Sequence, residues 1–331
     1  MSNRWPGGLI RKTPVTPAGP LQNGAAPGVW TLAEAAYWTK QGKWPTAGRG
    51  EFVAVGFFNS ANIYAWTSSG FGSKFADPAT VLGSAASGVA FTPAANAVAM
   101  SILSSPYVAA YPWSASGFGT RFADPATLPT GGGNGVAFSP AGNAIAVAHD
   151  TSPFITAYPW SGSGFGAKFA NPATLPAASG QGVAFSPAGN ALAVAHNTSP
   201  RITVYSWSGS GFGTKFADPA TLPGFSNGSK VAFSPAGNAI AVTNTVSSPF
   251  IQAYPWSGSG FGTKFTDPAT LPTGDGYGVA FNPAGNAIAV AHATSPFVTA
   301  YPWSGSGFGT KYANPATLPT GSGQGVAFGA T

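Results

Sequence analysis

The stretch Gly135–Gln181, GVAFSPAGNAIAVAHDTSPFITAYPWSGSGFGAKFANPATLPAASGQ, is the unit that decides the fold. Close copies of this unit follow one another through most of the chain. Self-similarity with a period of about 40–50 residues is typical of propellers and solenoids. The tryptophan of the YPW triplet recurs at intervals of 47, 47, 47, 49 and 47 residues, as Trp66, Trp113, Trp160, Trp207, Trp256 and Trp303. The phenylalanine of GVAF recurs as Phe91, Phe138, Phe185, Phe233, Phe281 and Phe328.

Each unit divides into four short β-strands separated by turn residues. GVAF is followed by the turn Ser-Pro-Ala-Gly-Asn, and AIAVAH forms the second strand. FITAYPW has the aromatic and β-branched residues of a third strand, and GTKFADP is a fourth that proline ends. No apolar period of 3.6 residues runs through the unit, which excludes a helical solenoid. The pattern therefore predicts an all-β protein of four-stranded blades.

The two ends of the repeat array complement each other. The first unit lacks GVAFSPAGN and begins at Glu51, whereas the last unit ends with an additional Gly325–Phe328. Pairing of this last strand with the first unit would hide the edge strands that an open array exposes. We therefore expect a six-bladed β-propeller over residues 51–331 that is closed by its terminal strands.

The VAFSPxGN…W skeleton of residues 51–331 resembles the repeats of the WD40 family. Two features depart from that family: the tryptophan is followed by Ser or Thr instead of Asp, and no Gly-His dipeptide precedes the first strand. The Asp-His-Ser-Trp hydrogen-bond tetrad of the family is therefore not expected here. We expect the six repeated tryptophans to pack the blades against one another instead.

The composition limits the classes of protein to which the chain can belong. Charged residues make up 7% of it, against about 25% in ordinary soluble domains, but a hydrophobic content of 44% is enough for a sizeable core. The absence of cysteine excludes disulfides and thiolate metal sites. No apolar run approaches the roughly 18 residues of a membrane span, and the N-terminus lacks the apolar segment of a secretory signal. We expect no membrane insertion.

The positive charge belongs to the first 50 residues. Six basic residues and one acid give residues 1–50 a net charge of +5, whereas eight basic and seven acidic residues give the rest +1. Residues 1–30 are rich in Pro and Gly, and Thr31 with Glu34 forms a capping box that predicts a short helix over residues 31–43. Because such a helix is not stable alone, it must dock on the propeller or on a partner, and we expect the arm to anchor on a partner. The expected anchoring residues are Arg4, Trp5, Arg11, Lys12, Trp30, Trp38 and Trp44.

Residues 28–331 resemble structural proteins of tailed-bacteriophage virions. The segment Gly28–Glu34, GVWTLAE, followed by Gln41–Pro45, QGKWP, is similar to an element that precedes repeat domains there, and AYPWSGSGFGTKFADPATLPTG is similar to their propeller repeats. The resemblance implies a virion protein, attached to the tail, baseplate or capsid. Its arm would bind other virion proteins, and its propeller would be displayed, with attachment to host-surface glycan as one use. It implies no nucleic-acid partner.

Repeated acidic and basic residues are the first candidates for chemistry. Because residues equivalent by repeat lie on different blades, their carboxylates are too far apart for the paired-carboxylate chemistry of glycosidases. The acidic position holds Asp77, Asp124, Asp218 and Asp267, with Asn171 and Asn314 in the other two units. Three residues earlier stand Lys74, Arg121, Lys168, Lys215, Lys264 and Lys311. These basic residues either form a ring of positive charge that binds an acidic glycan or partner, or they are solvated residues of an outer strand that prevent edge pairing. We favour the second interpretation.

Histidines, glycine-rich segments and further aromatic residues have structural explanations. His149, His196 and His292 share one repeat position with Asn244, and separate blades do not bring them together as zinc requires. The SGSGFG segments lack the Lys-Ser/Thr and helix of a phosphate loop and predict hairpin turns. In every unit a phenylalanine follows glycine: Phe71, Phe118, Phe165, Phe212, Phe261 and Phe308. We expect these rings to pack between blades; the alternative is that they stack on sugars. We expect no metal, no cofactor and no catalytic residue.

The sequence thus favours a non-enzymatic virion structural protein. A cytoplasmic WD40-like scaffold for protein partners is the first alternative, although the near-identity of the loops argues against the asymmetry that a partner surface needs. A carbohydrate-active enzyme is the second alternative.

Overall fold

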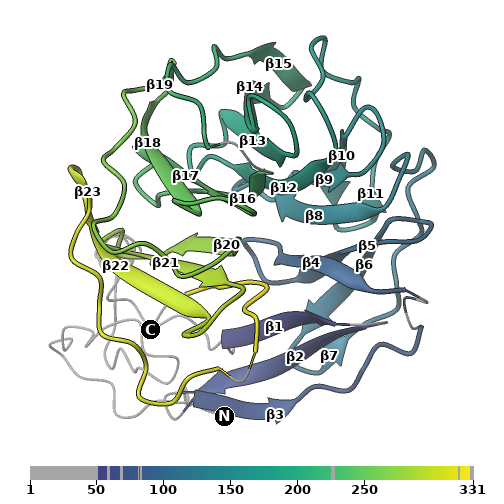
Figure 1. The fold of residues 1–331 in the computed structure, drawn as a ribbon. Helices are drawn as coiled ribbons and strands as arrows, with labels where there is room; N and C mark the ends of the chain where they lie inside the picture. Colours follow the sequence, from purple (N-terminus) through teal and green to yellow (C-terminus); the bar gives the residue numbers. More distant parts are fainter. Residues whose placement is uncertain are drawn as a thin grey trace, which may run out of the picture. The chain divides into compact units, whose positions relative to one another are not determined.

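The structure is a computed structural model that describes residues 51–328 apart from 58–59, 68–69, 81, 83, 225–227 and 320. All regular structure in these residues is β-strand, and no helix in them could cross a membrane (Figure 1). The predicted arm of residues 1–50, with its helix over 31–43 and its seven anchoring residues, lies outside the described residues. The chain divides into two compact units, Met1–Phe52 with Ala65–Gly72, and Val53–Tyr64 with Ser73–Thr331.

Twenty of the strands form five four-stranded antiparallel sheets, each built from four consecutive strands (Figure 1). The first is β4 (Ala86–Phe91), β5 (Ala97–Ile102), β6 (Val108–Ser114) and β7 (Gly117–Phe118). The second is β8 (Gly133–Phe138), β9 (Ala144–His149), β10 (Ile155–Ser161) and β11 (Gly164–Phe165). The third is β12 (Gly180–Phe185), β13 (Ala191–His196), β14 (Ile202–Ser208) and β15 (Gly211–Lys215). The fourth is β16 (Gly228–Phe233), β17 (Ala239–Asn244), β18 (Ile251–Ser257) and β19 (Gly260–Phe261), and the fifth is β20 (Gly276–Phe281), β21 (Ala287–His292), β22 (Val298–Ser304) and β23 (Gly307–Phe308).

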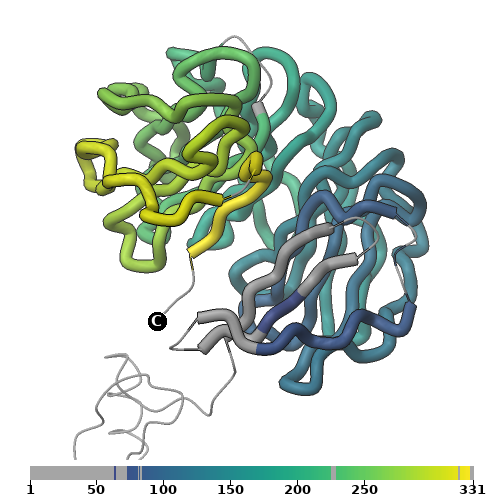
Figure 2. The backbone as a smooth tube through the Cα atoms, turned by 60° about the horizontal axis from the view of Figure 1, so that its bottom comes forward, coloured from purple at the N-terminus to yellow at the C-terminus, as the bar shows by residue number. Residues whose placement is uncertain are grey.

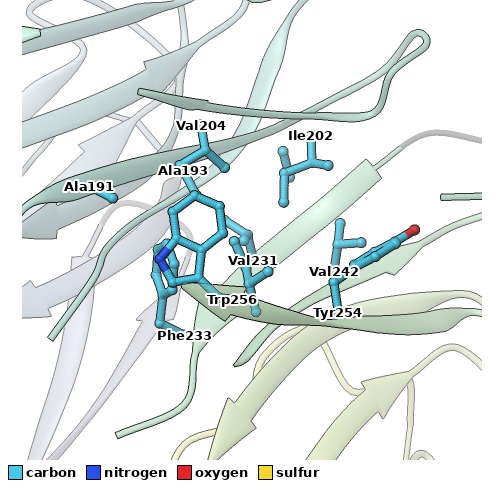
Figure 3. Close-up of a cluster of buried hydrophobic side chains, with 11 residues drawn as sticks. Ala191, Ala193, Ile202, Val204, Val231, Phe233, Val242, Tyr254 and Trp256 are labelled. Carbon is cyan, nitrogen blue, oxygen red and sulfur yellow. The ribbon is translucent and has the colours of Figure 1, made fainter. Parts of the chain in front are cut away.

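The core of these five blades lies between consecutive sheets. The small and β-branched residues of the second strand are buried along its whole length in β9, because sheets cover both of its faces. Figure 3 shows one such interface, where Ile202 and Val204 of one blade face Val231, Val242 and Trp256 of the next. The tube in Figure 2 follows the same course from repeat to repeat. The predicted repeat of four-stranded blades is therefore confirmed for residues 86–308.

The fourth strand is shorter than predicted in most blades. The sequence predicts a strand over GTKFADP, which is GAKFANP at 166–172 in the second blade, but β11 contains only Gly164 and Phe165 just before it, and residues 166–172 belong to no strand. The reason is the proline in the third strand, because Pro159 has no N–H to donate to the ladder. In the third blade Ser206 replaces this proline, and there β15 extends over five residues.

A further sheet, which precedes these five in the chain, has three strands: β1 (Glu51–Phe57), β2 (Ser60–Thr67) and β3 (Gly70–Lys74). The sequence predicts that residues 325–328 add a fourth strand to it, but in the structure residues 321–328 belong to no strand. Gly325 lies beside the last blade, 2.8 Å from an ideal Cβ on Gly278. The structure therefore does not confirm the predicted terminal pairing.

Candidate binding grooves

Each described tryptophan of the repeat is buried against three phenylalanines. The rings of Phe138, Phe165 and Phe122 meet Trp160 edge-on, with centroid distances of 5.0, 5.1 and 5.2 Å. The first two come from the first and fourth strands of the same blade, and Phe122 comes from the preceding repeat. The same arrangement surrounds Trp113, Trp207, Trp256 and Trp303, whereas the side chain of Trp66 lies outside the described residues.

This position explains the repeated phenylalanines as well. Phe165 packs on Trp160 and also lies edge-on to Tyr158, at a centroid distance of 5.6 Å. Its ring is only partly exposed because these two neighbours occupy its faces and edges. The geometry favours packing over sugar stacking for this residue and for its equivalents Phe118, Phe212, Phe261 and Phe308.

The Ser-Pro-Ala-Gly-Asn turn between the first two strands is held by its own side chains. The Ser139 hydroxyl accepts hydrogen bonds from the backbone N–H of Asn143 (3.2 Å) and Ala144 (3.0 Å), and it donates to Oδ1 of Asn143 (2.9 Å). Gly142 has a φ of 68°, which glycine adopts without strain. Asn143 is exposed, and its Nδ2 makes no hydrogen bond within the described part of the chain. The turn therefore presents a fixed amide donor to solvent.

Two such turns and the end of a third strand enclose a groove of about 320 Å³ between the second and third blades. Its walls are turn residues of both blades and the edge of Trp207, and they include no charged side chain. The lining residues are Ser139, Pro140, Ala141, Asn143, Pro187, Ala188, Gly189, Trp207, Ser208 and Gly209.

A second groove of about 290 Å³ repeats the first one unit earlier in the chain. Asn96, Gly142 and Trp160 take the places that Asn143, Gly189 and Trp207 have in the first groove, 47 residues later. The lining residues are Thr92, Pro93, Ala94, Asn96, Ala97, Pro112, Phe122, Ala141, Gly142, Trp160, Ser161 and Gly162. The sequence places the same types of residue at the next two seams, in Ser186–Asn190 with Trp256–Gly258 and in Ser234–Asn238 with Trp303–Gly305.

The repeated basic residues are paired within their own segments. Lys74 lies 2.7 Å from Asp77 and Lys215 lies 2.5 Å from Asp218. The other two ion pairs are Arg121 with Asp124 and Lys264 with Asp267, and the lysines Lys168 and Lys311 bond to Asn171 and Asn314. The four blades that carry an aspartate therefore do not contribute to a ring of free positive charge. This favours the interpretation of the basic residues as solvated residues of outer strands.

The repeated histidines are buried structural residues. Nε2 of His149, His196 and His292 lies 2.9 Å from the hydroxyl of a threonine on the neighbouring strand, and Asn244 takes this position in the fourth blade. Burial lowers the pKa of His149 and of His196 to about 4 and lowers that of His292. The rings are therefore neutral near pH 7. In the described part of the chain, no group of three or more His, Asp or Glu side chains is placed to hold a metal ion.

Two acids outside the repeat position, Asp150 and Asp275, are bound by neutral donors. Asp150 accepts hydrogen bonds from Asn134 (2.6 Å) and Ser179 (2.9 Å). Asp275 accepts one from the backbone N–H of Val246 (2.7 Å). Neither contact pairs two carboxyl groups in the manner of a general acid and base.

Sequence reasoning missed one functional candidate, Lys230. It stands in β16 at the position that holds glycine in the other units, so an alignment of the repeats would have revealed it. Its Nζ donates to the main-chain oxygens of Asn134 (2.8 Å) and Gln181 (2.6 Å), which belong to the two preceding blades. Burial lowers the pKa of Lys230 to about 8.

No family model and no curated protein matches the chain, but many solved structures share its fold. A protein from Lactobacillus plantarum matches with a TM-score of 0.63 and 16% identity, over 82% of this chain and 83% of that one. A putative 6-phosphogluconolactonase from Bacteroides uniformis has a TM-score of 0.60 and 16% identity over the same shares. A chain of the mitotic checkpoint complex has a TM-score of 0.55 and 17% identity, over 73% and 70%. These similarities show a WD40-like propeller fold and no activity.

Proposed function

We propose that the protein is a non-enzymatic attachment protein of a tailed-bacteriophage virion, and that its propeller binds repeated sugar units of a host-surface glycan through the grooves between blades. The observation that carries the binding role is the recurrence of one groove, with equivalent walls, one repeat apart. A polymer of identical units is the ligand that repeated identical sites suit best, because weak sites joined on one body gain in avidity.

The groove walls suit an uncharged sugar. Proline and alanine offer apolar contact to the C–H faces of a sugar ring, and the Asn143 amide and Ser208 hydroxyl offer hydrogen bonds to its hydroxyl groups. Neither groove is lined by a carboxylate or an ammonium group. We therefore expect neutral glycan in preference to acidic glycan.

Blocking the grooves tests this binding role. An added Cβ on Gly162 or on Gly209 meets no heavy atom within 4 Å, and alanine stands at the equivalent position 115. The double variant Gly162→Trp, Gly209→Trp should therefore fold and should lose about tenfold or more in affinity for the host polysaccharide in titration calorimetry. Gly321→Trp, also in open space, is the matched control and should bind as the wild type does. Unchanged binding by the double variant would refute the groove as the site.

The virion location is tested by removing the arm. The resemblance of residues 28–45 to phage proteins motivates it, as does the basic charge of this segment. A chain lacking residues 1–45 should keep the thermal unfolding midpoint of the full protein but fail to sediment with phage particles. Absence of the full-length protein from purified particles would contradict the proposal.

Binding without turnover is part of the proposal. The four repeated aspartates each bond to a basic residue three positions earlier, which supports a structural role for them. An assay for new reducing ends on bacterial polysaccharides decides between binding and hydrolysis. Turnover that one Asp→Asn substitution abolishes would favour the carbohydrate-active enzyme. Binding of partner proteins, and not of glycan, would favour the scaffold.

Closure of the ring also belongs to this proposal. Residues 325–328 would pair with the sheet of β1–β3, which has one strand fewer than each of the other blades. This pairing would cover an open sheet edge and make the displayed propeller rigid.

A further inference from the structure

Lys230 is the single large side chain at a position that the repeat otherwise keeps free of side chains. The equivalent residues are Gly88, Gly135, Gly182, Gly278 and Gly325. They are glycines because the first strands of neighbouring blades approach closely: an ideal Cβ on Gly135 would lie 3.2 Å from Cα of Gly182. The first strands of consecutive blades therefore approach closely at this position, and among the described first strands only β16 carries a side chain there.

The ammonium group of Lys230 is held by main-chain oxygens alone. Its contacts with the oxygens of Asn134 and Gln181 tie β16 to β8 and β12, so that one charge links three blades. Among the ion pairs of the described residues, none involves Lys230. Because the pKa of Lys230 is about 8, the group is still mainly the charged donor at pH 7.

We propose that the main-chain oxygens between the first strands form a site for a monovalent cation, which the protein fills with the ammonium group of its own Lys230. Carbonyl oxygens that replace a hydration shell are the ligands of potassium in channel filters. Divalent calcium and magnesium are bound mainly through carboxylates, and both contacts of Lys230 are with neutral oxygens. An ammonium ion and a potassium ion are close in size, so the empty site would accept either.

This arrangement makes the native protein independent of added cations. A tethered ammonium group is always present at the site, whereas a free ion would be lost on dilution.

The experiment removes the tethered cation and supplies a free one. Lys230→Gly introduces the residue of the other repeats, and its thermal unfolding midpoint is measured in 0.2 M KCl, NH4Cl or choline chloride. We expect KCl and NH4Cl to raise the midpoint of the variant by about 2–4 °C above choline chloride, the shift of a site with a dissociation constant near 10 mM. The wild type and Lys168→Ala, a change at the surface, should show no such difference.

A second variant separates charge from packing. Lys230→Met keeps a long side chain without charge and should gain nothing from either cation, because its side chain still fills the site. If Lys230→Gly does not fold in choline chloride, its refolding yield in KCl replaces the midpoint and should be higher. Equal midpoints or yields of Lys230→Gly in all three salts, or the same gain in Lys230→Met, would overturn the proposal.

Discussion

At the scale of the residue, the buried tyrosines show how one hydroxyl positions a distant segment. Tyr158 lies in the third strand, and its hydroxyl donates a hydrogen bond of 2.7 Å to the main-chain oxygen of Thr127, 31 residues earlier. Burial raises the pKa of Tyr158, so the hydroxyl keeps its proton. The same bond is made by Tyr111, Tyr205 and Tyr301. Each bond holds the extended segment that leads from one blade to the next.

The fourth blade offers a matched control for this bond. The hydroxyl of Tyr254 is buried but has no hydrogen-bond partner among the described residues. Tyr158→Phe should lower the free energy of unfolding by about 1–2 kcal/mol, because it leaves the oxygen of Thr127 without its donor. Tyr254→Phe should change it by less than about 0.5 kcal/mol. Urea unfolding of both variants measures the difference, and equal losses would show that the bond contributes nothing.

The histidines make stability depend on pH. Their pKa values in the folded state lie below the value of about 6.5 in the unfolded chain, so the unfolded chain binds more protons between pH 6.5 and pH 4. Stability is therefore full above pH 6.5 and should fall as the pH decreases to about 4. The thermal unfolding midpoint across this range measures the loss. His196→Asn, which introduces the residue of position 244, should flatten the profile, and an unchanged slope would contradict this account.

At the scale of the element, proline decides the length of the fourth strand. Blades with Tyr-Pro-Trp have a fourth strand of two residues, whereas the blade with Ser206 has one of five, in which Lys215 pairs with Tyr205. Pro159→Ser supplies the missing N–H and should extend β11 toward Lys168. Hydrogen exchange should then show amides 167 and 168 more protected than in the wild type, whereas the amide of Gly166 already donates to the main-chain oxygen of Pro159. Ser206→Pro should have the opposite effect on β15, and failure of both changes would exclude the proline as the cause.

Most of the strands and the core of each blade could be predicted from the sequence. The positions of the first three strands follow from alternating turn and β-branched residues, and the blade core follows from the small residues of AIAVAH. The length of the fourth strand depends on a donor in the third strand, which a pattern within the segment does not reveal. The grooves could not be predicted because each needs the distance between two turns that lie 47 residues apart. The contacts of Lys230 are hidden for the same reason, since they join three repeats.

At the scale of the whole molecule, the sequence predicts the number of repeated blades. Strand pairing between the two ends of the chain depends on tertiary contacts, which the repeat pattern does not reveal. Removing residues 325–331 tests the proposed closure. If it forms, the truncated chain should lose protection of the amides in β1, and its thermal midpoint should fall by about 1–2 °C for each kcal/mol of pairing lost. Removal of residues 329–331 alone is the control and should change neither. Unaltered exchange in β1 after the longer truncation would show that the ring stays open.

The ring of Phe122 that covers Trp160 belongs to the previous repeat, and this has a consequence for how the protein can be built. A single repeat cut from the chain would leave its indole uncovered, so one repeat is not a self-sufficient folding unit. The smallest autonomous fragment should be a pair of neighbours, and assembly should proceed outward from such a pair. Gene duplication in whole units preserves this pairing, because each inserted unit brings a phenylalanine for the indole of the unit that follows it.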